Sequence, residues 1–202
     1  MRSFTKFQST ISSLVLGVFL AGTTSLFADA KFDVGKPDFD DILSPDIGAK
    51  KSWKPKNWLE MEVKVKVAAV SPKPKDDFVD EVRIRWYVAV KNPAGKGYWL
   101  LEKEVTHVNV PIGEEVYASV YLSPNSVKRL SGGERASKSI LEMVGGEITV
   151  AGKTEYFTSK GKAGWWTSGS LSRTDKVPLL NKDETPFKAA WYDRDAEIKE
   201  KR

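Results

Sequence analysis

Two short stretches carry letters that are typical of nucleotide hydrolases. Residues 130–137 read LSGGERAS, which looks like the signature sequence of ATP-binding cassette ATPases, and residues 152–154 read GKT, like the end of a phosphate-binding loop. Such a loop needs the spacing GxxxxGK[ST], because this spacing curls backbone N–H groups around the phosphates. Here Glu147 stands where the first glycine should be, and its carboxylate would repel phosphate.

The order and the context of these letters also argue against an ATPase. In ATP-binding cassette proteins the phosphate loop precedes the signature by a long stretch, whereas here GKT follows LSGGE. Apolar residues flank GKT as in a β-hairpin, while a phosphate loop must open a helix. We therefore expect no ATP binding, and we expect residues 131–133 to close a short helical turn, because glycine permits the φ > 0 conformation that ends helices.

Residues that commonly supply catalysis or bind metals are scarce. The chain has one histidine, His107, and no cysteine, which excludes the usual zinc sites, and it contains no GxSxG nucleophile motif. The acidic pairs at 40–41, 76–77 and 114–115 lack calcium-loop spacing and suit solvated turns. A glycosidase needs only two carboxylates, so that class stays open. We expect no enzymatic activity, no cofactor and no metal.

Seven tryptophans are the more informative excess. Trp53 and Trp58 lie in the basic stretch KKSWKPKNW, and Trp165 and Trp166 are adjacent in GWWTSGS. In a strand, neighbouring side chains point to opposite faces, so one of the adjacent pair would be exposed. Exposed tryptophan suits sugar rings and protein contacts. These four residues are candidate ligand or partner contacts, and packing of an N-terminal arm is the alternative explanation. The modest, interspersed charge disfavours a nucleic-acid ligand.

The N-terminus is typical of a secretory signal peptide. Two basic residues precede an uncharged apolar run at 11–22, and Ala28 and Ala30 form the small-x-small pattern that signal peptidase accepts. The apolar run is shorter than the roughly 20 residues of a membrane span. We expect a signal peptide over residues 1–30, with cleavage after Ala30 slightly favoured over cleavage after Ala28. The exported protein would then lie in the periplasm or at the outer membrane, without a transmembrane anchor.

Alternation of apolar and polar residues predicts most of the strands, each with one buried face. Strands are expected at residues 60–67, 79–90, 98–110 and 115–122, as a hairpin over 147–159, and at 165–171. The alternation slips by one residue within 98–110, which predicts either a β-bulge or a strand that changes sheets near 102–106. A Ser-Pro start predicts a short helical turn near 124–130.

These strands predict an all-β fold, an antiparallel immunoglobulin-like β-sandwich of about seven strands over residues 58–180. Residues 31–57 are rich in Pro, Gly, Asp and Lys and are expected to form an extended N-terminal arm. Residues 181–202 are expected to form a charged C-terminal tail, with an aromatic island at 187–192 that packs back on the domain. A single domain of this length can bury a self-sufficient core.

Three stretches carry a resemblance to a known family: NWLEMEVKVKV at 57–67, DEVRIRWYVAVKN at 80–92 and KDETPFKAAWYDRDAEI at 182–198. With the signal peptide, they make the chain resemble exported immunoglobulin-like proteins encoded beside type IV pilus assembly genes in Verrucomicrobia, including the Akkermansia lineage. The resemblance implies a role in pilus assembly or retraction and offers no active-site residues. Pilins retain a long apolar helix, whereas this chain is expected to lose its apolar segment, which favours an accessory protein.

The sequence as a whole therefore predicts a non-enzymatic exported envelope protein, an accessory or binding component of a type IV pilus-like system. Its sandwich would bind other envelope or pilus proteins through an edge strand or through its aromatic patches. The alternative is a carbohydrate-binding module of the cell envelope that binds glycans through Trp165 and Trp166.

Overall fold

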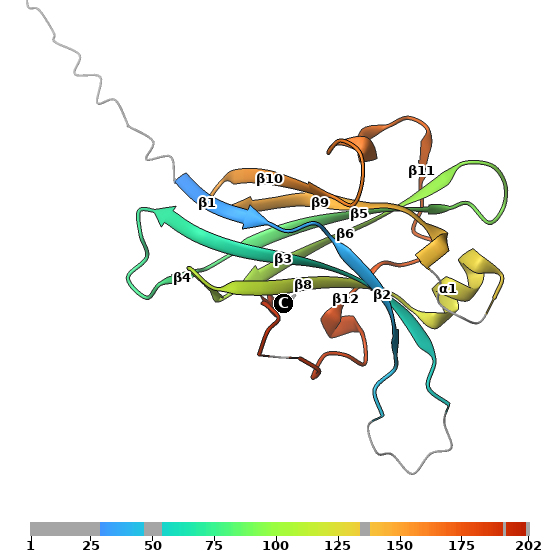
Figure 1. The fold of residues 1–202 in the computed structure, drawn as a ribbon, viewed down its shortest axis with the longest axis horizontal. Coiled ribbons are helices and arrows are strands. Elements are labelled where there is room, and N and C mark those ends of the chain that lie inside the picture. The colour runs from blue at the N-terminus through green and yellow to red at the C-terminus, as the bar shows by residue number, and fades with distance from the viewer. Residues whose placement is uncertain (1–28, 47–53, 134–137, 192, 201–202) are drawn as a thin grey trace, which may run out of the picture.

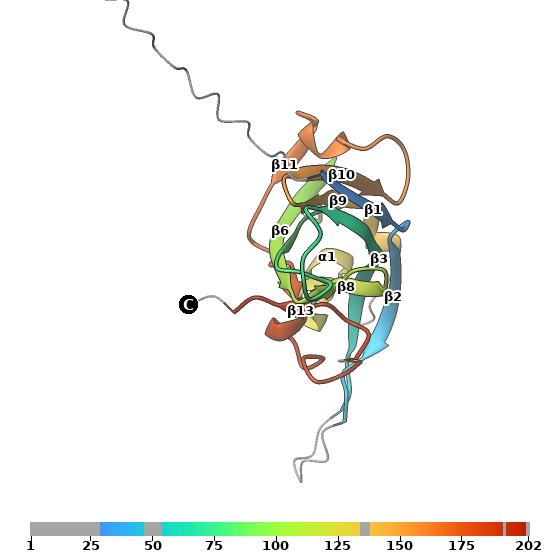
Figure 2. The same cartoon turned by 90° about the vertical axis from the view of Figure 1, so that its left-hand side faces the viewer.

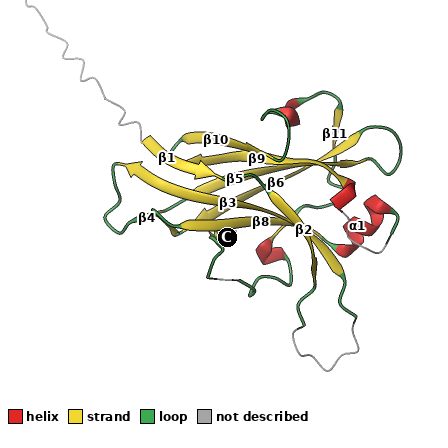
Figure 3. Cartoon of the chain, viewed as in Figure 1, coloured by secondary structure: helices red, strands yellow, loops and turns green. Residues whose placement is uncertain are grey.

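Two β-sheets make up most of the structure, a computed structural model that describes residues 29–46, 54–133, 138–191 and 193–200 (Figures 1 and 3). Sheet one contains β1 (Asp29–Val34), β2 (Asp38–Leu43), β3 (Asn57–Ser71), β8 (Glu115–Leu122) and β12 (Leu180–Asn181). Sheet two contains β5 (Val82–Lys91), β6 (Tyr98–Val108), β9 (Leu141–Val150), β10 (Lys153–Thr158), β11 (Leu171–Arg173) and β13 (Glu197–Ile198). The remaining elements are the paired strands β4 (Phe78–Val79) and β7 (Val110–Pro111), the helix α1 (Pro124–Ser131) and the short 3₁₀ helices η1 (Lys138–Ile140), η2 (Trp165–Thr167) and η3 (Lys182–Glu184).

The two sheets pack face to face as a β-sandwich (Figure 2). Sheet one has the order β1-β3-β8-β12, and β2 pairs with the other end of β3; sheet two has the order β10-β9-β5-β6-β11, and β13 pairs with β6. All strand pairs between named strands are antiparallel except β11 with β6.

The core forms where the inner faces of the two sheets meet, and it contains the apolar rows expected from the sequence. Met61, Val63 and Val65 of β3 are at most 1% exposed, and alternate residues of the neighbouring β8 and of β5 in the other sheet are also buried. Trp86 lies at 0% exposure with its ring edge-on to Phe157, 5.0 Å between centroids. This burial of alternating residues confirms the all-β sandwich.

The segment expected as an extended arm contributes two strands to sheet one. β1 pairs with residues 65–71 of β3 and β2 pairs with residues 57–62, so the two lie end to end along one edge of the sheet. Ala30 and Phe32 enter the core at 1% and 7% exposure. Each strand has only six residues, and residues 35–37 interrupt them, so the alternation is too short to predict them from the sequence.

Two further expectations on sheet two are wrong. β6 pairs with β5 in unbroken register from Tyr98 to His107, so the bulge near 102–106 is absent from this described pair. The alternation of buried and exposed residues changes phase instead at Asn109, which lies between β6 and β7 and has a positive φ of 53°. Residues 165–171 do not form a strand: η2 occupies their start, and β11 begins at Leu171.

The two segments that resemble nucleotide-binding motifs have structural roles. α1 begins after the cap Ser123, whose Oγ accepts a hydrogen bond from the Ser126 N–H, and ends at Gly132 with φ of 72°, which confirms the helical turn and its glycine stop. Residues 134–137 lie outside the described part of the chain. The GKT letters fall at the β9–β10 hairpin, where Ala151 and Gly152 both have positive φ, as a two-residue hairpin turn requires.

Candidate functional site

The outer face of sheet two carries a cluster of aromatic side chains at the end where η2 folds over it. Trp166 is 3% exposed, and its ring stacks on that of Tyr87 with 4.8 Å between centroids and 9° between planes. Its Nε1–H donates to Glu147 Oε1 at 3.2 Å. Trp165 is half-buried, edge-on to Trp166, and donates from Nε1–H to Thr158 Oγ1 at 3.1 Å. Both indoles are therefore held in place by hydrogen bonds as well as by packing.

Two glycines in β9 make room for this cluster. A Cβ at Gly145 would lie 2.7 Å from the Phe157 carbonyl oxygen and 3.1 Å from Trp165 Nε1. A Cβ at Gly146 would lie 2.5 Å from the Arg85 carbonyl oxygen and 2.5 Å from the Phe157 ring. Real Cβ atoms essentially never approach another heavy atom within 3.0 Å, so a side chain at either position would force its neighbours to shift. The pair therefore lets aromatic rings lie directly on the backbone of β9.

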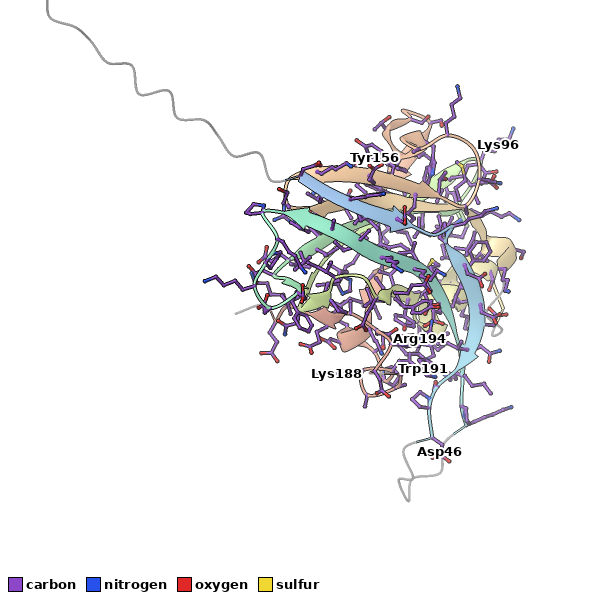
Figure 4. The ribbon with its side chains drawn as sticks, turned by 60° about the vertical axis from the view of Figure 1, so that its left-hand side comes forward. Asp46, Lys96, Tyr156, Lys188, Trp191 and Arg194 are labelled. Carbon is purple, nitrogen blue, oxygen red and sulfur yellow. The ribbon has the colours of Figure 1, made fainter. Side chains whose placement is uncertain are left out.

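Tyr156 is the exposed member of the aromatic cluster. It is 56% exposed, and its ring lies 6.2 Å from that of Trp166 (Figure 4). Its cross-strand partner is Glu147, and Glu147 in turn pairs with Arg85 on β5. The row continues to Glu104 of β6, which is opposite Arg85. An exposed aromatic ring thus stands at one end of a row of alternating charges.

The charges beside Tyr156 form a ladder of exposed ion pairs. Arg85 Nε lies 3.2 Å from Glu102 Oε1 and 3.4 Å from Glu104 Oε2, and Arg173 Nη1 donates to Glu102 Oε2 at 2.6 Å. Exposed ion pairs contribute little to stability, so their members can exchange internal contacts for contacts with a partner at low cost. We call Arg85, Glu102, Glu104, Glu147 and Tyr156 the Tyr156 face. It offers donors, acceptors and one ring, which suits recognition of a polar partner.

The outer face of sheet one is covered by the C-terminal segment. Phe187 is fully buried between Tyr121 and Trp191, with centroid distances of 5.3 and 6.0 Å, and Trp58 meets it edge-on at 5.7 Å. Trp58 is half-buried and donates from Nε1–H to Ser44 Oγ at 3.0 Å. This packing confirms that the aromatic island of the tail docks on the domain. It assigns Trp58 to that docking.

A polar network fixes the same segment to β3 and β8. Lys182 and Asp195 form an ion pair in which both side chains are under 10% exposed. The Tyr121 hydroxyl donates to Glu60 Oε1 at 2.7 Å, and Arg194 contacts Glu62 at 2.5 Å. Burial raises the pKa of the Glu60 carboxyl, and burial likewise raises that of Glu62. Glu62 holds the C-terminal segment to β3 through Arg194, whereas the hydrogen bond of Glu60 joins β3 to Tyr121 of β8 within the sheet.

His107 has a structural environment as well. It is 2% exposed on β6, and its Nδ1 lies 3.1 Å from the carbonyl oxygen of Ala196, next to β13. Burial lowers the pKa of the imidazole to about 4. Among the described residues, no group of three or more His, Cys, Asp or Glu side chains is placed to hold a metal ion. The described part of the chain also contains no helix long and apolar enough to cross a membrane.

The four tryptophans expected as contacts do not form one site. Trp165 and Trp166 lie together on sheet two, Trp58 lies under the tail on sheet one, and Trp53 lies outside the described residues. Sequence reasoning missed Tyr156. The alternation in TEYF, residues 154–157, could have predicted its exposure, because Phe157 faces the core and Tyr156 must then point outward.

The fold and these surfaces define an all-β sandwich protein with one outer face covered by its own tail and the other partly open. A protein-family model matches residues 24–202, and the chain belongs to that family. A crystal structure of a protein from Akkermansia muciniphila is similar to it, with a TM-score of 0.81 and 38% sequence identity over 87% of this chain and 96% of that chain. This source agrees with the verrucomicrobial resemblance of the sequence. No curated protein sequence matches the chain.

Proposed function

We propose that the protein is a non-enzymatic exported protein of the cell envelope, an accessory and protein-binding component of a type IV pilus-like system. The family match over residues 24–202 carries this proposal. It spans the three stretches on which the resemblance to verrucomicrobial pilus-cluster proteins rests. The N-terminal sequence supports export, because basic residues, an apolar run and a small-x-small site occur in that order.

The Tyr156 face is the surface that we assign to partner binding. Tyrosine and arginine are, with tryptophan, enriched among the residues that dominate binding energy at protein interfaces, and Tyr156 and Arg85 lie on one face of sheet two. The neighbouring Trp166 is locked by Tyr87 and Glu147, so the surface around Tyr156 is rigid before binding. Rigid surfaces lose less conformational entropy on association.

Affinity capture tests the pilus role. The tagged protein is expressed from its own promoter, cross-linked in intact cells and purified from the envelope, and its partners are identified by mass spectrometry. We expect pilus assembly or pilus subunit proteins to be enriched over a tagged, unrelated exported protein. Recovery of only those abundant envelope proteins that the control also recovers would refute the pilus role.

A carbohydrate-binding role is the second candidate, and the exposed ring of Tyr156 beside Arg85 and Glu147 is the observation that favours it. Trp166 cannot present a ring face to a sugar, because it is 3% exposed against Tyr87. A glycan array with the wild type, Tyr156→Ala and Trp165→Ala distinguishes the roles. Glycan binding that both substitutions leave intact would exclude this surface as a sugar site.

A further inference from the structure

A column of three stacked rings begins on the outer face of sheet one and ends at Trp191. Tyr121 of β8 is fully buried and stacks on Phe187, with 5.3 Å between centroids and 15° between planes. Phe187 is also fully buried and stacks on Trp191, at 6.0 Å and 14°. Trp191 is 48% exposed. Because Phe187 covers one face of its indole, the exposed area lies on the opposite face and along the edge of the ring.

This exposure sets Trp191 apart from the other tryptophans. Six of the seven lie in the described part of the chain, and among these Trp191 alone is exposed; the others are buried or half-buried, namely Trp58, Trp86, Trp99, Trp165 and Trp166. The exposed side chains nearest to it along the chain are charged rather than apolar: Lys188, Asp193 and Arg194. A single indole among charged groups differs from the apolar cluster at the centre of a protein interface.

The backbone holds the indole in a conformation that is unfavourable for so large a side chain. Trp191 has a φ of 53°, in the left-handed region that bulky residues rarely adopt. Two turns enforce it, because the Ala190 N–H donates to the Phe187 carbonyl at 2.8 Å and the Arg194 N–H donates to the Trp191 carbonyl at 3.2 Å. Strain of this kind is concentrated at functional sites. The ring is thus fixed before a ligand arrives, which lowers the entropy lost on binding.

Hydrogen-bonding groups lie beside the ring. Lys188 and Arg194 stand three residues before and three residues after Trp191 on the same loop (Figure 4). The Arg194 guanidinium lies over the ring of Tyr117, 3.8 Å from its centre, and one of its N–H groups is paired with a carboxylate of β3. A guanidinium has five N–H donors, so others remain for a ligand. Asp193 is exposed and adds an acceptor. A flat apolar face with donors and an acceptor at its edge matches a ligand that is itself apolar on one face and polar at its rim.

We propose that Trp191 and the polar side chains beside it form a carbohydrate-binding site. One pyranose ring lies with its C–H face on the free face of the indole, and its hydroxyls bond to Arg194 and Lys188. Single-stranded nucleic acid stacks on successive rings along a positively charged groove, whereas this column ends in one exposed ring and Asp193 would repel phosphate. The proposal does not depend on the pilus role, and the site lies on the opposite outer face from Tyr156.

A glycan array of neutral and acidic oligosaccharides, probed with the purified protein, tests the proposal. The oligosaccharide that gives the strongest signal is then titrated into the wild type and the variants. Trp191→Ala removes the ring, Trp191→Phe keeps a smaller one, and Lys188→Ala removes a donor. Tyr156→Ala is the matched control, because it removes a similarly exposed ring from the other outer face. Circular dichroism and the thermal midpoint establish that each variant keeps its fold.

We expect the affinity to fall about tenfold or more in Trp191→Ala, to fall less in Trp191→Phe and Lys188→Ala, and to stay unchanged in Tyr156→Ala. The bound sugar should also shield the indole from acrylamide, so that it reduces the quenching of wild-type fluorescence but not that of Trp191→Phe.

An array on which no oligosaccharide binds overturns the proposal, as does wild-type affinity in Trp191→Ala. Binding that is lost in Tyr156→Ala and kept in Trp191→Ala would place the sugar on the Tyr156 face instead. A protein cross-linked from position 191, with no oligosaccharide bound by the array, would identify this surface as a protein contact and replace the carbohydrate assignment.

Discussion

The indole of Trp166 lies flat on the phenol ring of Tyr87, 4.8 Å away and tilted by 9°, and so clamps η2 onto the outer face of sheet two. Trp166→Ala removes this ring and its hydrogen bond to Glu147. Buried tryptophan replaced by alanine costs about 3–5 kcal/mol, so we expect a loss of this size in urea unfolding. Tyr156→Ala is the control, because Tyr156 is 56% exposed and should change stability by no more than about 0.5 kcal/mol. A Trp166→Ala protein as stable as the wild type would show that η2 is not clamped in this way.

Gly146 should resist even the smallest substitution. An added Cβ would lie 2.5 Å from the Arg85 carbonyl oxygen and from the Phe157 ring, so β5 or β10 must shift. Overpacking of this kind costs about 1–3 kcal/mol, and we expect Gly146→Ala to lower the thermal midpoint accordingly. Gly95→Ala is the matched control, since its Cβ would meet no atom within 4 Å. Equal midpoints for the two variants would contradict the close approach of Phe157 to β9.

Local alternation explains why the sandwich could be predicted and why parts of it could not. β3, β5 and β8 alternate over eight or more residues, so their faces follow from the sequence. β9 begins at Leu141 and contains Gly145 and Gly146, which break the pattern because rings from elsewhere fill their places. Only the tertiary structure supplies those rings.

The candidate site was predictable in type but not in position. The sequence singled out Trp165 and Trp166 as candidate contacts, and the structure places both rings in an aromatic cluster with Tyr156. The expectation that Trp165 and Trp166 alternate required a strand, and the glycine turn before them starts a 3₁₀ helix instead. In that helix Trp166 turns onto Tyr87, which the sequence places about eighty residues away. Tyr156 remains as the exposed ring.

The stability of the protein should fall as the pH decreases from about 6.5 towards 4. Burial holds the pKa of His107 at about 4, while the same side chain in the unfolded chain has its ordinary value of 6.5. Between these values the unfolded chain binds the proton and the folded protein does not, so the unfolded state is favoured as the pH falls. The difference corresponds to about 3 kcal/mol, measurable by urea unfolding across this range.

His107→Gln isolates this effect from that of the buried carboxyls. The raised pKa values of Glu60 and Glu62 act in the opposite direction, because the folded protein takes up their protons at a higher pH than the unfolded chain. Glutamine does not titrate, so the variant should lose the destabilisation between pH 6.5 and 4 and keep the opposing contribution. Parallel pH profiles for the variant and the wild type would exclude His107 as the cause.

The register of β1 bears on where the expected signal peptide would be cleaved. Ala30 pairs with Val70 and is 1% exposed, and Asp29 pairs with Ser71. Cleavage after Ala30 would remove both residues from β1, whereas cleavage after Ala28 would keep the strand whole. We therefore expect the exported protein to begin at Asp29, to be read from its intact mass and its N-terminal peptide. A mature protein that begins at Lys31 would show that β1 forms without its first two residues.

Photo-cross-linking at position 156 tests the central claim, recognition of pilus-system proteins by the Tyr156 face, most directly. A photoreactive phenylalanine replaces Tyr156 in one variant and Trp191 in the other; both positions are about half exposed, on opposite outer faces of the sandwich (Figure 4). After irradiation of intact cells, we predict that position 156 yields a cross-link to a pilus assembly or pilus subunit protein and that position 191 does not. Cross-links of equal yield at the two positions, or a position-156 product that contains no pilus-system protein, would contradict the account.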